Sequence, residues 1–143
     1  MKGLDAAKAV GAALLVLALN FALVYLAVAA YAQFVEPGRS SDVYAAAAPR
    51  IAGWSAPIGG ALLLLAAAYV LGRGRPERNA LRFAGLIWLA YVVLDLGSGL
   101  AMGAASQMVW PMMALSMGMA LAGALAGGAL ARPGAAAVSN VTS

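Results

Sequence analysis

Apolar residues fill four long segments of the chain, and polar residues fall mainly in the stretches between them. The segments span about residues 9–35, 51–71, 81–102 and 108–131. Each holds about 20 residues or more, which is long enough as an α-helix to cross about 30 Å of hydrocarbon. Lipid cannot satisfy exposed backbone groups, so helices are expected. The pattern predicts an all-α fold: a polytopic membrane protein built as a four-transmembrane-helix bundle.

Composition strengthens this prediction and narrows the chemistry. Of the 143 residues, 64% are hydrophobic and 10% are charged, which is too few charges to cover the surface of a soluble domain. The chain contains no Cys and no His. Thiol redox chemistry, disulfides, zinc sites and Cys or His catalysis are therefore excluded, and we expect no cofactor, no metal site and no catalytic residues.

The connecting stretches give the domain organisation. Residues 1–132 form a single transmembrane domain, and residues 133–143 have the composition of a disordered cytoplasmic tail. Between the first two segments, Ser40 or Ser41 is expected to cap a short surface helix over residues 42–48, and Pro49 is expected to end it. Gly72 and Gly74 are expected to end the second membrane helix.

The first segment has one alternative interpretation, a cleaved signal peptide. Lys2 and Lys8 precede the apolar run, and Ala30-Tyr31-Ala32 resembles a signal-peptidase site. The apolar core of a signal peptide is usually about 7–15 residues long, and this run is longer. A retained membrane helix is therefore favoured.

The basic residues predict the orientation. With four spans, both termini and the loop at 72–80 lie on one side of the membrane. That side carries Lys2, Lys8, Arg73, Arg75, Arg78, Arg82 and Arg132, whereas the other side carries Arg39 and Arg50. The positive-inside rule then places both termini in the cytoplasm, as expected for a multi-pass protein of a bacterial inner membrane. The net charge of +4 is explained in this way and does not indicate nucleic-acid binding.

Asp95 is the main candidate for function, because it stands inside the third apolar segment. Steps of three and four residues place Tyr91, Asp95 and Ser98 on one helix face, which we expect to turn toward the bundle interior. No Lys or Arg lies well inside any of the four segments to balance its charge. An estimate of depth adds further candidates for an ion- or ligand-binding site with Asp95, Ser98 and Tyr91: Ser116, Tyr25, Asn20 and, at the outer mouth, Gln107.

Three roles for Asp95 stay open. It can be a neutral acid that joins helices by hydrogen bonds, a site for a cation or cationic ligand, or a charge that meets a partner subunit. A catalytic acid is the weakest interpretation, because no second titratable group falls near it. The chain is therefore not expected to be an enzyme.

Methionines and small residues complete the pattern. Six methionines fall between residues 102 and 119, but a copper site is a weak interpretation without Cys or His, and a soft helix surface is favoured.

The fourth segment carries two rows of small residues, one at Ala114, Gly118, Ala122 and Ala126 and the other at Ser116, Ala120, Ala124 and Gly128. Such rows allow helices to approach closely, within the bundle or in a homo-oligomer or larger membrane complex.

Two functions follow. In the first, a small non-enzymatic membrane protein binds or moves a cation, proton or small solute at Asp95. In the second, an accessory subunit packs against a larger complex through its small-residue faces. The first function predicts a polar cavity that opens outward, and the second predicts an exposed patch of Gly and Ala. Small multidrug transporters are similar in size, but their motif has a glutamate in the first helix, where this chain carries Asn20.

Overall fold

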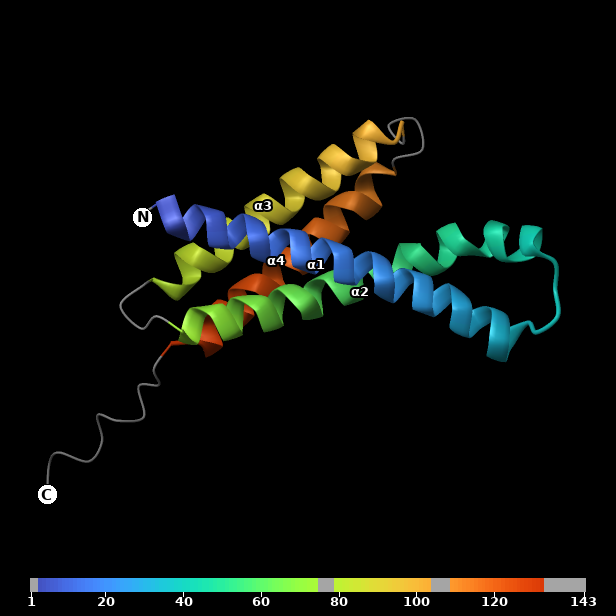
Figure 1. Ribbon diagram of the computed structural model, residues 1–143, viewed down its shortest axis with the longest axis horizontal. Helices are drawn as coiled ribbons and strands as arrows, with labels where there is room; N and C mark the ends of the chain where they lie inside the picture. Colours follow the sequence, from blue (N-terminus) through green and yellow to red (C-terminus); the bar gives the residue numbers. More distant parts are fainter. Residues whose placement is uncertain (1–2, 75–78, 104–108, 133–143) are drawn as a thin grey trace, which may run out of the picture.

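The computed structural model describes residues 3–74, 79–103 and 109–132 and folds them into long helices (Figure 1). The elements in chain order are α1 (Gly3–Ala30), the short π-helix η1 (Tyr31–Val35), α2 (Ser41–Arg73), α3 (Ala80–Ala101) and α4 (Trp110–Leu130). The all-helical class is confirmed, since the described residues contain no strand. The boundary predicted at residue 132 and the tail at 133–143 concern residues at or beyond the end of the described part.

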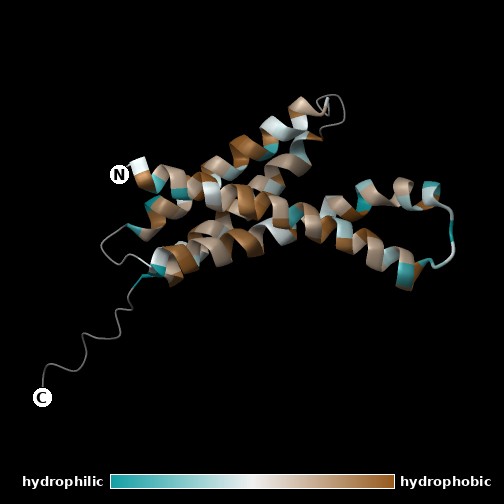
Figure 2. Ribbon diagram, in the orientation of Figure 1, coloured by the Kyte–Doolittle hydropathy of each residue, from teal (hydrophilic) through white to brown (hydrophobic). Residues whose placement is uncertain are grey.

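All four helices are long and apolar enough to cross a membrane, as the sequence predicts. Figure 2 shows the apolar ribbon running through the middle of the molecule, with hydrophilic segments mainly at the connection between α1 and α2 and at the opposite ends of the helices. The helices differ in length. The first span with its π-helical end and α2 each hold 33 residues, whereas α3 and α4 hold 22 and 21.

The helices form two hairpins that meet at one end of the molecule and diverge toward the other (Figure 1). We call the shared end, where α1 and α3 begin and α2 and α4 end, the base. The tips are the far ends of the α1–α2 and α3–α4 hairpins. Helix α4 packs most extensively on α2, α1 contacts both α2 and α3, and α1 and α4 lie diagonally across the bundle.

Buried residues gather toward the base. The buried positions of α1 end at Asn20, those of α3 end at Tyr91, and those of α4 begin at Ala120. In α2 all but Ile51 lie from Gly59 onward, toward the base. The largest fully buried side chains are those of Phe83, Leu64 and Ile87. The core therefore fills the base half of the bundle.

Glycines of α4 allow α2 to approach at backbone distance. A β-carbon on Gly123 would lie 2.2 Å from the carbonyl oxygen of Ala61, and one on Gly127 would lie 2.2 Å from that of Leu65. Any side chain at either position would displace the neighbouring helix. The helices run parallel through this contact, since the pairs advance together by four residues on both helices.

The two predicted rows on α4 have different surroundings. Ala120, Ala124 and Gly128 are buried against the bundle. A β-carbon on Gly128 would lie 2.9 Å from that of Ala84 on α3. The other row, at Ala114, Gly118, Ala122 and Ala126, is exposed. The closest α2 contact uses Gly123 and Gly127, which belong to neither predicted row.

The prediction that Pro49 ends a short surface helix is wrong. Helix α2 begins at Ser41 and continues through Pro49 and Pro57 without a break. Proline removes one backbone donor and crowds the carbonyl four residues earlier, which for Pro49 is that of Ala45. Ala45 is exposed, so that carbonyl is not confined within packed protein. Ser40 is the N-cap residue, but its side chain makes no capping hydrogen bond.

Of the two glycines predicted to end α2, Gly72 acts through close packing and Gly74 is the C-cap residue. Gly74 has an ordinary right-handed conformation, with φ −67°, so it does not need the freedom of glycine to end the helix. Gly72 is buried, and a β-carbon there would lie 2.6 Å from that of Ala131. Helix α3 then begins after Asn79, whose side-chain oxygen accepts a hydrogen bond from the backbone N–H of Arg82 at 3.1 Å.

Candidate functional site

A buried polar pair joins α1 to α3 where the packed base gives way to the diverging tips. The Asn20 side-chain amide donates a hydrogen bond to the Tyr91 hydroxyl at 3.1 Å. Asn20 is 6% exposed and Tyr91 is 5% exposed. Two residues that the sequence proposed for the site are thus brought together, although they are 71 positions apart in the chain.

Two consecutive glycines of α2 make room for this pair. A β-carbon on Gly59 would lie 2.8 Å from the Asn20 carbonyl oxygen, and one on Gly60 would lie 3.3 Å from the Tyr91 hydroxyl. Both glycines are buried. The α2 backbone therefore approaches the polar pair at a distance that a larger residue would not permit.

Two buried polar atoms at this level have no hydrogen-bond partner among the described residues. They are the carbonyl oxygen of the Asn20 side chain and the hydroxyl oxygen of Ser55. Ser55 stands one helical turn from Gly59 on α2, on the side toward the tip. Buried polar side-chain atoms usually have a partner in protein or ordered water. Ser55 was not among the residues predicted for the site, although its position four residues before a glycine in an apolar helix is a signal that could have indicated it.

Asp95 lies one helical turn beyond Tyr91 toward the tip, on the same face of α3. Its residue is half-buried. Within residues 3–74, 79–103 and 109–132, its carboxylate makes no hydrogen bond or ion pair. No residue in this part of the chain therefore supplies the countercharge that an acid in an apolar helix requires.

The remaining candidates are placed differently. The Ser98 hydroxyl donates to the backbone carbonyl of Asp95 at 2.9 Å, so it does not satisfy the carboxylate. Ser116 is half-buried on α4, and no hydrogen bond joins it to Asp95 in the described structure. The Tyr25 side chain is 75% exposed and turns away from the Asn20 pair. Gln107 lies outside the described residues.

A second polar cluster organises the tip of the α1–α2 hairpin. The Tyr31 hydroxyl donates to the Glu36 side chain at 2.8 Å, and the Tyr44 hydroxyl donates to the Glu36 backbone carbonyl at 2.7 Å. The backbone N–H of Arg39 donates to the same Tyr44 hydroxyl at 2.9 Å. These bonds join the end of η1 to the beginning of α2. The polar groups of the cluster are hydrogen-bonded to one another and need no ligand.

Two hydrogen-bond acceptors, on Asn20 and Asp95, have no donor among the described residues. One of the two amide hydrogens of Asn20 is used on Tyr91, whereas the Asn20 carbonyl oxygen and the Asp95 carboxylate have no protein donor in the described structure. Such a set suits a proton, a cation or a ligand with donor groups. The described residues contain no group of three or more His, Cys, Asp or Glu arranged to hold a metal ion.

The described methionines at the end of α3 and along α4 are exposed or half-buried. Met102 is 71% exposed and Met112 is 53% exposed. Met117 contributes its backbone carbonyl, which accepts a hydrogen bond from the Trp88 indole at 3.0 Å and joins α4 to α3. These placements agree with methionine as a surface and packing residue.

Comparisons with protein-family models, with curated proteins and with solved structures give no match to this chain. Function is therefore argued from the chain's own residues.

Proposed function

We propose that this chain is a small, non-enzymatic integral membrane protein that binds or moves a proton, a cation or a small cationic solute at Asp95. The four helices cross the bilayer, and the base with both termini lies on the cytoplasmic side of a bacterial inner membrane. By position in the sequence, seven Lys and Arg residues fall on the side of the termini and the 72–80 loop and two fall on the other side, which supports this orientation.

The α1–α2 hairpin then extends beyond the membrane at its tip. A helix of 33 residues is about 50 Å long, which exceeds the roughly 30 Å of hydrocarbon. Trp54 and Trp110 are 56% and 66% exposed, and residues of this type mark membrane surfaces. Trp110 begins α4, whereas Trp54 lies about 20 Å along α2 from Ser41. The Tyr31–Glu36–Tyr44 cluster would therefore stand in water outside the bilayer.

The unpaired carboxylate of Asp95 is the observation that carries the proposal. An acid at membrane depth is expected to have a partner, and its described surroundings offer none. The Asn20 carbonyl oxygen, one level closer to the base, lacks a donor in the same way. A ligand that brings positive charge or donor groups would satisfy the half-buried carboxylate of Asp95.

The proposal is tested with full-length protein in liposomes that contain a pH-sensitive dye. An imposed pH gradient should collapse faster than in empty liposomes, and tetraphenylphosphonium, a lipophilic cation, should bind the purified protein by calorimetry. Asp95→Asn keeps the shape of the side chain and removes its charge, so it should abolish whichever activity is present. Asp42→Asn is the matched control, because that carboxylate is exposed at the tip.

Two results would contradict the proposal. The first is wild-type protein that neither speeds proton movement nor binds the cation. The second is an activity that Asp95→Asn retains in full, because the charge at Asp95 would then be unnecessary.

An accessory role is the second candidate, and one observation favours it. The α4 row Ala114, Gly118, Ala122 and Ala126 is exposed along its length, so a neighbouring helix could pack against these small side chains. The described cavities, in addition, are lined by α1 with α2 and by α1 with α3, and neither includes Asp95.

Single cysteines distinguish this role, because the natural chain has none. Gly118→Cys lies within the exposed row, and Gly97→Cys lies on the exposed surface of α3. A β-carbon on either glycine would meet no atom within 4 Å, so a cysteine fits at both positions without a clash. Cross-linking in native membranes at Gly118→Cys, but not at Gly97→Cys, would identify a partner on α4. Equal reaction at both sites would argue against the accessory role.

A further inference from the structure

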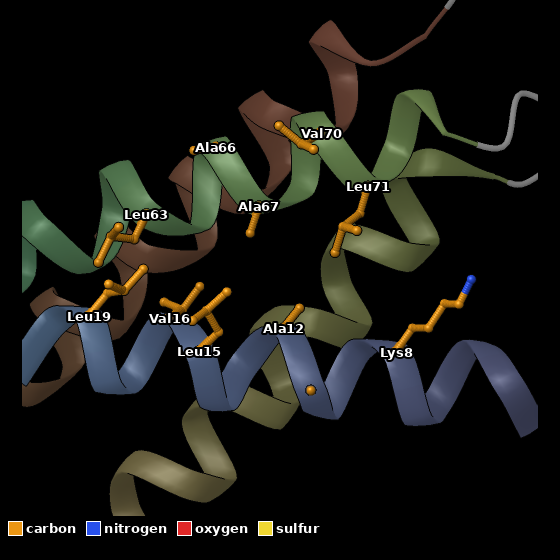
Figure 3. A pocket seen from close by; sticks show the side chains of 11 residues that line it. Lys8, Ala12, Leu15, Val16, Leu19, Leu63, Ala66, Ala67, Val70 and Leu71 are labelled. Atoms are coloured by element: carbon orange, nitrogen blue, oxygen red, sulfur yellow. The ribbon is translucent and has the colours of Figure 1, made fainter.

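An apolar groove runs between α1 and α2 in the base half of the molecule, on a different surface from Asp95. It encloses about 550 Å³ and is open on one side. Its walls are aliphatic, and its one charged lining residue is Lys8. Figure 3 shows Lys8 at one end of the row and Leu19 at the other, with Leu63 and Val70 on the facing helix.

Small residues produce the groove. Gly11 and Ala12 of α1 line it, as do Ala66 and Ala67 of α2. A β-carbon on Gly11 would have no atom within 4 Å, so the space beside it is open. The two helices are therefore separated here by short side chains, and larger residues could fill the gap without moving either backbone.

The length of the groove matches one leaflet of a bilayer. Lys8 and Leu19 are 11 residues apart, which is about 17 Å along an α-helix. Half of a hydrocarbon core of roughly 30 Å is about 15 Å. The charged end of the groove is at the base, where a lipid headgroup would lie, and the apolar end reaches the bilayer midplane.

Lys8 is available to a ligand. Within the described residues it makes no ion pair or hydrogen bond. The nearest basic residue on the facing helix, Arg73, is instead occupied by Tyr69, to which it donates a hydrogen bond and over whose ring it lies at 5.3 Å. Lys8 is thus the cation at the mouth of the groove.

We propose that this groove holds one acyl chain of an anionic phospholipid, with the lipid phosphate on Lys8. The aliphatic walls alone would not distinguish lipids, because the surrounding bilayer is equally apolar. Selectivity comes from the Lys8 ammonium, which favours an anionic headgroup by about fivefold. The proposal requires the helices to lie in a membrane, but it does not depend on Asp95.

Native mass spectrometry of the full-length protein tests the proposal. The protein is equilibrated with an equal mixture of phosphatidylglycerol and phosphatidylcholine, and the retained lipid is measured. We expect one phosphatidylglycerol per chain. Lys8→Gln should reduce the preference for phosphatidylglycerol about fivefold, to near parity. Arg82→Gln, which removes a base-side charge that does not line the groove, should leave the preference unchanged.

A second pair of variants tests the cavity itself. Gly11→Leu fills the groove and should remove the retained lipid whatever its headgroup. Gly85→Leu is the matched control, because that glycine also has open space around it but lies on α3 outside the groove. Asp95→Asn should retain lipid as the wild type does, so failure of the site at Asp95 and failure of the lipid groove can be told apart.

Three outcomes would overturn the proposal. One is lipid retention by Gly11→Leu equal to that of the wild type. Another is an unchanged headgroup preference in Lys8→Gln. The third is a wild-type dimer that Gly11→Leu separates, because the occupant of the groove would then be a helix of a second copy of the chain.

Discussion

The base and tip halves of the same four helices are held together in different ways. In the base half, Gly123 and Gly127 of α4 lie against the backbone of α2, and Gly128 lies against α3. In the tip half the hairpins diverge (Figure 1), and α1, α3 and α4 have no buried residue there among those described. The Asn20–Tyr91 hydrogen bond marks the boundary.

The difference shows what specifies close packing in an alanine-rich chain. Small residues occur in both halves, yet the closest of the described glycine contacts form in the base half, where Gly123 and Gly127 of α4 meet the backbone of α2. Beyond the boundary, α1 and α2 extend farther than α3 and α4 and carry the Tyr31–Glu36–Tyr44 cluster, and α3 carries Asp95. The close-packed contacts therefore lie in the base, and Asp95 lies beyond them on the tip side.

The largest expected effect is at the α2–α4 contact. Gly127→Ala adds one β-carbon at a position already occupied by the Leu65 carbonyl. We expect a loss of about 1–3 kcal/mol in the free energy of unfolding, as for other overpacked cores. Unfolding by sodium dodecyl sulfate in mixed micelles, followed by far-UV circular dichroism, measures it.

Gly118→Ala is the control for this substitution, because it lies on the same helix with open space around it. The higher helix propensity of alanine should leave stability unchanged or raise it by up to about 1 kcal/mol. Equal losses for both variants would mean that helix α4 responds to any substitution, and the contrast between packed and exposed faces would be wrong.

A smaller loss is expected at the boundary. Tyr91→Phe removes the hydroxyl that accepts from Asn20 and leaves the buried amide without a partner. We expect the free energy of unfolding to fall by about 0.6–2 kcal/mol, the range measured for polar contacts between membrane helices. Tyr25→Phe should have no effect, because Tyr25 is 75% exposed. If the two variants unfold alike, the Asn20–Tyr91 bond does not hold α1 to α3.

The smallest global effect is expected at the tip. Tyr44→Phe removes the hydroxyl that joins the Glu36 carbonyl to the Arg39 N–H. We expect faster hydrogen exchange over residues 36–48 and a change in global stability below about 0.5 kcal/mol, because the tip is not part of the core. Tyr69→Phe, at the base, should leave exchange at the tip unchanged. A large global loss in Tyr44→Phe would show that the halves unfold as one unit.

Hydropathy was sufficient to predict the class and the number of helices. The four apolar segments are visible in the sequence because each carries few charges over the length of a span. The 3.6-residue period also placed Tyr91, Asp95 and Ser98 on one face, and in the structure Tyr91 is buried while the other two are half-buried on that side of α3. Period and hydropathy are properties of a single helix, so they can be predicted from its sequence without knowing which helices pack against it.

Contacts between helices could not be predicted in the same way. Small residues recur on every face of α4, so the sequence did not indicate that Gly123 and Gly127 meet α2 while Gly118 stays exposed. The estimate of depth made Tyr25 and Asn20 equal candidates for the site, although only Asn20 is buried in the structure. Local rules predict a helix end at Pro49, but α2 continues through both Pro49 and Pro57.

The chemical state of Asp95 tests the functional account most directly. Infrared difference spectra of the full-length protein in lipid, with Asp95→Asn subtracted, isolate the carboxyl absorption of this residue. We predict a band that changes as pH is varied and changes again when a cation is added at fixed pH. A carboxyl band that responds to neither protons nor any added cation would contradict the account and leave Asp95 as a fixed structural group.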